Sequence, residues 1–222
     1  QESYLEDAIR YAEMINTESW IKYDTTAHYK LYPFVNIGHY ALYSQVDDEQ
    51  KEKLASYYRS GIEKVKERSS RNPYMVGTPF IWCSNNIITA LITQILLYEK
   101  MTGDRSYHDV MVAHRDWLFG TNPWGTSMFM NIPEDGEYPE DVHTSVYALT
   151  GVEVPGGLID GPIYASIYRN LLGLELTGDD EFEAFQNDIV VYHDDIGDYS
   201  TNEPTMDGTA STLLMFVTLN SD

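Results

Sequence analysis

Apolar residues recur along most of the chain at intervals of three and four positions, the spacing of one face of an α-helix. In the segment 3–16, one such face carries Leu5, Ala8, Ile9, Ala12 and Ile15. The same spacing predicts helices over 33–42, 48–68, 85–100, 104–119, 161–173 and 205–219. Pro33 opens the helix 33–42, and Asp47 with Gln50 caps the helix 48–68. No segment alternates convincingly between apolar and polar residues. The pattern therefore predicts an all-α fold of about seven helices.

The segment 85–100 is the most apolar part of the chain, with isoleucine and leucine on two adjacent rows. We expect this helix to be buried on most of its circumference. It ends at Thr102-Gly103-Asp104, where glycine can take the left-handed position after a helix. The same three residue types return at 177–179, before another helical spacing at 182–189. This repetition suggests stacked helical hairpins.

The segment 120–160 interrupts the helical pattern with repeated proline and glycine. A run of about forty residues without regular structure is far longer than the usual loop, and such long loops are commonly functional. We therefore expect part of a functional site in this segment.

Charge and composition narrow the classes of ligand. The formal net charge of −21 disfavours nucleic acid and anionic membrane surfaces, because both would be repelled. Neutral substrates suffer no such penalty, and the 13% aromatic content, with 18 Tyr and 4 Trp, suits stacking on the faces of sugar rings. The sequence contains no apolar run of transmembrane length. The chain begins at Gln1, so we expect a processed protein or a piece of a larger one.

The most concentrated group of carboxylates lies between Asp194 and Gly208. One interpretation is a solvated acidic loop. The other is that Glu203 is held protonated by apolar burial and neighbouring acids, as the acid of a glycosidase must be. Asp207 better suits a capping or orienting role near the start of a helix.

Other polar and aromatic residues permit two interpretations each. His143 could bind a sugar hydroxyl or satisfy a loop carbonyl, and Trp82 and Trp124 could be stacking platforms or core residues. A metal site built from His143, His193 and the adjacent acids lacks any supporting ligand motif, and we expect no required cofactor. Structural calcium on loop carboxylates stays possible, although the sequence has no EF-hand spacing.

Several stretches resemble, in order, the glycoside hydrolases of family 9, the cellulase family with an (α/α)6 barrel. The motif Tyr192-x-Asp194-x-x-x-x-Tyr199-x-x-Asn202-Glu203-x-x-x-Asp207 is similar to the C-terminal active-site signature of that family. Upstream, Trp82-Cys83-Ser84-Asn85 resembles the Trp-Gly-Ser-Asn element of the family. The other matching elements are Thr102-Gly103-Asp104 followed by the segment 118–125 with its Asn122-Pro123, and the glycine turn Gly156-Gly157-Leu158 with Gly161-Pro162. The resemblance covers the chain from Trp82 to Gly208.

The resemblance implies hydrolysis of β-1,4-glucosidic bonds in glucans by an inverting mechanism, with Glu203 as the general acid. It places His143 in a loop that contacts the sugar, and it makes Asp194, Tyr199, Asn202 and Asp207 supports of the acid. We expect Tyr199 and Asn202 to bind substrate as well, together with His143, Trp82 and Trp124. Three departures from the family pattern, Ile196, Thr144-Ser145 and Gly208, leave xyloglucan and other oligosaccharides open beside cellulose. A secreted, periplasmic or cell-surface location follows from the same resemblance.

The catalytic base of the family, an aspartate in an Asp-Ala-Gly-Asp-type motif, has no counterpart in this sequence. We therefore interpret residues 1–222 as the C-terminal part of one (α/α)6 catalytic domain, and we expect pairing with the N-terminal half or self-association. The alternative is a carbohydrate-binding or structural fragment without catalysis. A polysaccharide lyase is a weaker alternative, because 14 basic residues against 35 acidic ones suit an anionic substrate poorly.

Overall fold

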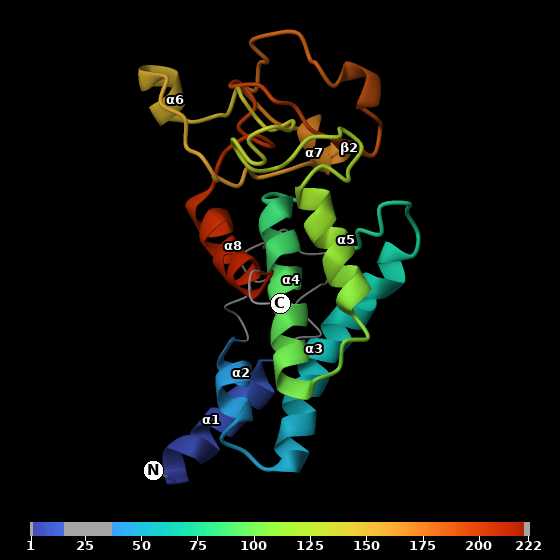
Figure 1. Ribbon diagram of the computed structural model, residues 1–222, viewed down its shortest axis with the longest axis vertical. Coiled ribbons are helices and arrows are strands. Elements are labelled where there is room, and N and C mark those ends of the chain that lie inside the picture. The colour runs from blue at the N-terminus through green and yellow to red at the C-terminus, as the bar shows by residue number, and fades with distance from the viewer. Residues whose placement is uncertain (1, 16–36, 220–222) are drawn as a thin grey trace.

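The longer helices occupy one part of the molecule, and long loops that carry two short helices occupy the other (Figure 1). The computed structural model describes residues 2–15 and 37–219. Its helices are α1 (Glu2–Met14), α2 (Ile37–Tyr43), α3 (Asp48–Ser69), α4 (Ser84–Thr102), α5 (His108–Leu118), α6 (Ser145–Thr150), α7 (Ala165–Tyr168) and α8 (Met206–Leu219). Two short strands, β1 (Ile163–Tyr164) and β2 (Val190–Val191), pair antiparallel, and a 3-10 turn covers Glu183–Phe185. The predicted helix start at Pro33 lies outside the described residues.

The α4 helix is the centre of the core. It packs against α3, α5 and α8, and every residue from Ser84 to Tyr98 is buried. This confirms the burial predicted from the two apolar rows of the segment 85–100. Gly103 follows α4 with φ +73° and donates its backbone N–H to Glu99, which is the predicted left-handed end of the helix.

The start of α3 also follows the sequence prediction. The Asp47 side chain accepts a hydrogen bond of 2.9 Å from the backbone N–H of Gln50, so it caps the first turn. This contact needs only residues three positions apart, which explains why the local sequence was sufficient to find it.

The predicted helices over 161–173 and 182–189 are wrong. Gly161 has φ +88°, and Ile163 pairs with Val191, so only the four residues of α7 remain helical in the first segment. The second segment contains a single 3-10 turn. The Thr-Gly-Asp sequence at 177–179 therefore does not repeat a helical hairpin, and its Thr177 and Gly178 instead bind the Asp195 carboxylate.

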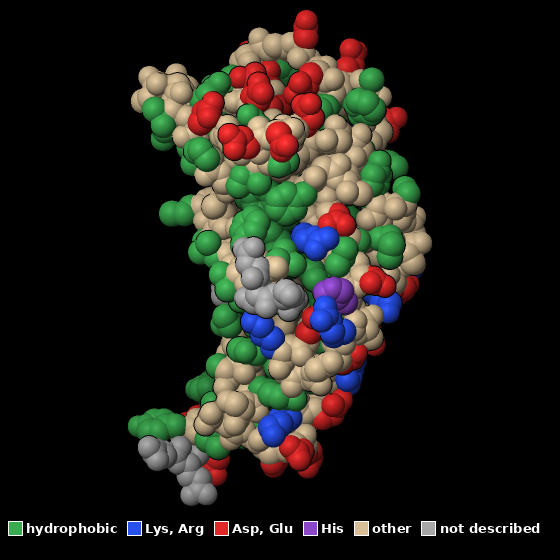
Figure 2. All heavy atoms as spheres, viewed as in Figure 1, with side chains coloured by type: hydrophobic (Ala, Val, Ile, Leu, Met, Phe, Trp, Pro, Cys, Tyr) green, Lys and Arg blue, Asp and Glu red, His purple; other side chains and the backbone are tan. Residues whose placement is uncertain are grey.

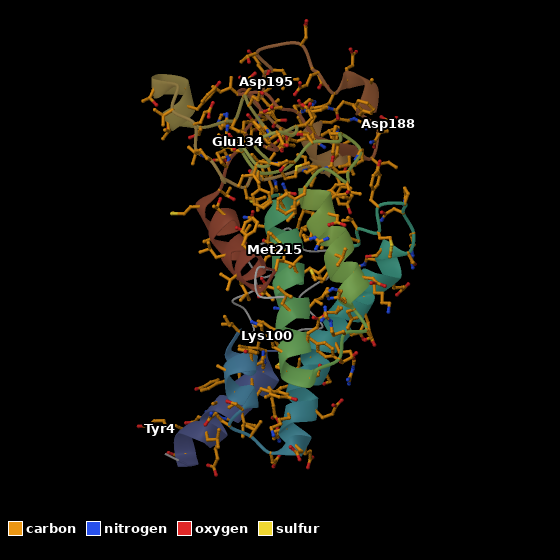
Figure 3. The ribbon with its side chains drawn as sticks, viewed as in Figure 1. Tyr4, Lys100, Glu134, Asp188, Asp195 and Met215 are labelled. Atoms are coloured by element: carbon orange, nitrogen blue, oxygen red, sulfur yellow. The ribbon has the colours of Figure 1, made fainter. Side chains whose placement is uncertain are left out.

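The loops that follow α5 gather beyond the ends of α4, α5 and α8, at the end of the molecule opposite α1 (Figure 1). Asp195 lies among these loops, far from Tyr4 of α1 (Figure 3). The predicted irregular segment 120–160 is confirmed, with the six-residue α6 as its one helix. Of the helices in the described ranges, none is long and apolar enough to cross a membrane.

Candidate active site

The first turn of α4 anchors the loops that carry the candidate site. The backbone N–H of Asn85 donates to the carbonyl of Asp160, and the Asn85 side chain donates to the carbonyl of Ile159, both at 2.9 Å. Thr205 donates its hydroxyl to Asn86 at 3.3 Å. Two distant loop segments are therefore held on the same helical turn.

These two segments run antiparallel beside each other and fix the backbone around Glu203. The N–H of Gly161 donates to the Thr201 carbonyl at 3.0 Å, and the N–H of Asp160 donates to the Glu203 carbonyl at 2.9 Å. Thr205 donates its N–H to Leu158 at 3.0 Å. The Glu203 backbone is thus held on both sides while its side chain is exposed.

The prediction that Glu203 is buried is wrong, because the residues that the structure describes leave its side chain exposed. The side chains of Glu203 and of Asp207, in the first turn of α8, are both exposed. Figure 2 shows acidic side chains gathered over the loop end of the molecule. An exposed carboxylate on a fixed backbone can reach a ligand that approaches from outside these residues.

Asp194 organises the loop that precedes His143. Its carboxylate accepts hydrogen bonds from the backbone N–H groups of Glu140 (2.7 Å) and Asp141 (3.1 Å) and from the Asn202 side chain (2.8 Å). Burial raises the pKa of Asp194 above its usual value, although these three hydrogen bonds favour the ionised form. The predicted supporting residues Asp194 and Asn202 are therefore in direct contact.

The same loop brings His143 beside two of the predicted sugar-binding residues. The His143 backbone N–H donates to the Asn202 carbonyl at 2.9 Å, and its Nδ1 lies 2.6 Å from the Ile196 carbonyl. The His143 and Tyr199 rings meet nearly edge to face, with centroids 6.2 Å apart. The Trp82 ring also stacks on the Tyr199 ring, with an interplanar angle of 13°. These three half-buried rings form one row next to the segment that carries Glu203.

Trp124 is not part of this row. Its side chain is 5% exposed, and its ring packs nearly edge to face against Trp117 and Tyr192. The prediction of an exposed stacking platform at Trp124 is therefore wrong, because the loop after Asn122-Pro123 turns the indole into the core.

Asp160 is a buried carboxyl group that the sequence did not single out. Its side chain is 3% exposed, and its Oδ1 has no hydrogen-bond partner among the described residues. Burial raises the pKa of Asp160 well above its usual value, and the charges of Glu203 and Asp207 act in the same direction. A hydrogen bond from the Cys83 thiol opposes this rise. In the sequence, only the position of Asp160 within the glycine turn 157–161 indicates a role in the site.

Cys83, the partner of Asp160, precedes α4 with φ +55° and ψ 48°, a left-handed conformation that glycine adopts more easily. The family element that this segment resembles has glycine at the corresponding position. The conformation explains that glycine, and the cysteine adds a thiol beside the buried carboxyl group.

Asp198 and Asp195, two further acids of the loop, accept hydrogen bonds from other groups of the protein. Burial alone would raise the pKa of Asp198, but hydrogen bonds from His193, Ser200 and Thr201 hold it below its usual value. Asp195 is held in the same way, since hydrogen bonds from Gly197, Gly178 and Thr177 outweigh its burial. Across residues 2–15 and 37–219, no group of three or more His, Cys, Asp or Glu side chains could hold a metal ion.

Comparison with known proteins identifies the family of the chain. The sequence model of the Glycosyl hydrolase family 9 matches residues 1–216. The chain belongs to this family. A comparison with curated proteins finds no match.

Solved structures of family 9 share the fold of the chain, which is part of an (α/α)6 barrel. A metagenome-derived glycoside hydrolase family 9 endoglucanase is 22% identical with a TM-score of 0.62, over 84% of this chain and 32% of its own. The family 9 endoglucanase J30 is 23% identical with a TM-score of 0.64, over 93% of this chain and 38% of its own. AaCel9A, solved in complex with cellobiose-like isofagomine, is 23% identical with a TM-score of 0.63, over 83% of this chain and 35% of its own. The chain thus spans about a third of the length of these family 9 structures.

Proposed function

We propose that this family 9 chain supplies the general acid, Glu203, for the hydrolysis of β-1,4-glucosidic bonds in glucans. The observation that carries the proposal is the position of Glu203. Its carboxylate is exposed on a backbone held by Asp160 and Thr205, beside the ring row of His143, Tyr199 and Trp82. AaCel9A, solved with a cellobiose-like ligand, supports a glucan as the substrate.

In the proposed inverting reaction, the Glu203 carboxyl group protonates the glycosidic oxygen of the leaving sugar. A second carboxylate must activate water on the opposite face of the sugar, at a separation of roughly 6.5–9.5 Å from the acid. The sequence lacks the Asp-Ala-Gly-Asp-type motif that would carry this base. We therefore propose that residues 1–222 act as the C-terminal part of one catalytic domain, with the base and the remaining barrel outside them.

The ring row suits the sugar next to the cleaved bond. The Trp82 and Tyr199 rings are stacked, so together they offer an apolar edge to the C–H groups of a pyranose. His143 has Nδ1 at the Ile196 carbonyl, which leaves Nε2 as the ring nitrogen available to a sugar hydroxyl. Cellulose, xyloglucan and related oligosaccharides all satisfy this arrangement.

The test is Glu203→Gln in the full-length protein, because glutamine keeps the shape of the side chain but cannot donate the proton. We expect turnover of cello-oligosaccharides to fall by about 10²–10⁴-fold while their binding persists. The loss should be much smaller for an aryl cellobioside whose leaving group needs no protonation. Glu134→Gln, an exposed glutamate of the same loop end, is the matched control. Equal turnover of Glu203→Gln and the unaltered protein on both substrates would refute the assignment.

The second candidate function is binding without catalysis, which the missing base motif favours. In that case the full-length protein binds cello-oligosaccharides through the ring row but releases no reducing sugar. Steady release of reducing sugar, abolished by Glu203→Gln, would exclude it.

A further inference from the structure

The end of the molecule that carries the proposed site has almost no positive charge. Residues 120–219, which include the loops and α8, contain 18 acidic side chains and one basic side chain, Arg169. Arg169 pairs with Asp188, so its charge is offset locally. Residues 1–119 are nearly balanced, with 16 acidic and 13 basic side chains. Figure 2 shows the same division, with acidic side chains gathered over the loops and the Lys and Arg side chains of that face over the helices.

Acids from three separate segments meet near the His143 end of the ring row. Glu140 and Asp141 have exposed side chains, and their backbone N–H groups donate to Asp194. Asp141 is two positions from His143, so the Cα atoms of these two residues lie within about 7 Å of each other. Burial raises the pKa of Glu181, and the charges of Asp194, Glu140 and Asp141 act in the same direction. The ion pairs among the described residues include none of these four acids.

The segment of the proposed acid adds further negative charge. Glu203 and Asp207 are both exposed. Their charges, together with burial, raise the pKa of Asp160, which shows that these acids lie close enough to influence one another. A negative potential therefore extends from the loop before His143 to the start of α8. Such a potential concentrates ligands of the opposite sign and acts over about 8 Å at physiological salt.

This potential selects among sugars that share the β-1,4 linkage. A neutral pyranose gains nothing from it, and a uronic acid is repelled. Glucosamine gains, because an ammonium group replaces the hydroxyl at C2 while the chair and the linkage stay those of glucose. An ammonium group forms charge-assisted hydrogen bonds with carboxylates and is attracted to the faces of aromatic rings. The acids and the ring row offer both kinds of contact.

We propose that the Glu203 site acts on β-1,4-linked glucosamine, a chain whose sugars carry an ammonium group at C2. This inference rests on the proposed hydrolysis and names its substrate class. The reaction is unchanged: the bond from C1 to the leaving oxygen breaks, that oxygen takes the proton of Glu203, and water bonds to C1 and gives a proton to the base. Positive charge that develops at C1 beside an ammonium group is unfavourable, and the acids around the site offset it.

Hydrolysis by the full-length protein tests the proposal, with the tetrasaccharide of β-1,4-linked glucosamine compared with cellotetraose at a mildly acidic pH that keeps the amine protonated. We expect kcat/KM to be at least about tenfold higher for the glucosamine tetrasaccharide, and this ratio to shrink as salt is added. Glu140→Gln combined with Asp141→Asn should lower the ratio severalfold. The matched control is Asp48→Asn combined with Glu49→Gln, which removes the same two charges from the exposed first turn of α3, far from the loops, and should leave the ratio unchanged.

Binding separates this inference from the proposed hydrolysis. In calorimetry, Glu203→Gln should bind the glucosamine tetrasaccharide more tightly than cellotetraose, although it turns over neither rapidly. If cellotetraose is hydrolysed as well as the glucosamine tetrasaccharide or better, the substrate assignment is overturned while the hydrolysis stands. If neither is hydrolysed, the hydrolysis fails, and the binding comparison still decides the assignment: tighter binding of glucosamine supports it and equal binding overturns it. A preference that is unaffected by salt, or that N-acetylated glucosamine shares, would overturn the role of charge.

Discussion

The side-chain amide of Asn202 donates a hydrogen bond of 2.8 Å to the carboxylate of Asp194. Asn202 is the immediate neighbour of Glu203 in the chain, and Asp194 also holds the backbone N–H groups of Glu140 and Asp141. One carboxylate thus joins the segment of the proposed acid to the loop that ends at His143. The position of His143, a proposed sugar-binding residue, therefore depends on Asp194, which need not touch the sugar.

We expect Asp194→Ala to destabilise the protein strongly, because three donors lose their acceptor at once. The free energy of unfolding should fall by about 2–4 kcal/mol. Asp194→Asn keeps one acceptor oxygen and should cost less. Urea denaturation measures both values. Asp188→Ala removes an exposed acid paired with Arg169 and should lower stability by less than about 1 kcal/mol. A loss for Asp194→Ala no larger than that of the control would contradict the central role of Asp194.

The raised pKa of Asp160 predicts a dependence of stability on pH. A carboxyl group whose pKa is higher in the folded state than in the unfolded state holds more protons when folded. Its contribution is therefore fully present below the ordinary value of 3.8 and is lost as pH rises toward the folded pKa. In Asp160→Asn this loss should vanish. The difference in unfolding free energy between the two proteins should then change by up to about 1.4 kcal/mol per pH unit above 3.8.

Chemical denaturation at a series of pH values measures this difference. A difference that stays constant from pH 3 to pH 8, to within about 0.3 kcal/mol, would show that Asp160 titrates alike in both states.

Gly161 offers a test of the close packing between the site and α4. A Cβ at this position would lie 2.3 Å from the side-chain amide of Asn85, on a backbone with φ +88°. Gly161→Ala must therefore displace Asn85, which anchors Asp160 and Ile159, and we expect it to cost more than about 3 kcal/mol. Gly151→Ala is the matched control, since Gly151 has φ +64° and open space around it. The control should cost only about 1 kcal/mol from backbone strain, measured by thermal unfolding.

The exposed apolar residues of α8 predict association. Leu213 and Val217 are each 64% exposed, four positions apart on one face of a helix. We expect the 222-residue chain alone to self-associate, or to pair with a fragment that carries the rest of the barrel, through this face. Sedimentation should show a concentration-dependent mass that Leu213→Asp lowers. A monodisperse folded monomer at all concentrations would contradict the prediction.

Local contacts account for what the sequence could predict. The Asp47 cap of α3 and the Gly103 end of α4 depend on residues within one helical turn, and both are confirmed. The apolar rows of α4 likewise predict that this helix is buried, and they do so without knowledge of the helices that pack against it. The family signature placed Glu203, Asp194 and Asn202 in one stretch, although their roles in catalysis stay predictions.

Contacts between distant segments account for what the sequence could not predict. The segment after Gly161 has helical spacing, but Ile163 pairs with Val191 and the helix is reduced to four residues. Trp124 lies after a proline in a loop, yet the packing of Trp117 and Tyr192 buries it. Asp160 becomes a buried acid only because α4 and the Glu203 segment converge on it.

The first turn of α4 has a consequence for the order of assembly. Asn85 and Asn86 hold segments that lie more than seventy and more than one hundred positions further along the chain. The loops around Glu203 can therefore acquire their final shape only after the first turn of α4 has formed. During synthesis α3, α4 and α5 precede these loops and α8 follows them, so the packing of the first three helices does not depend on the sequence of the loops.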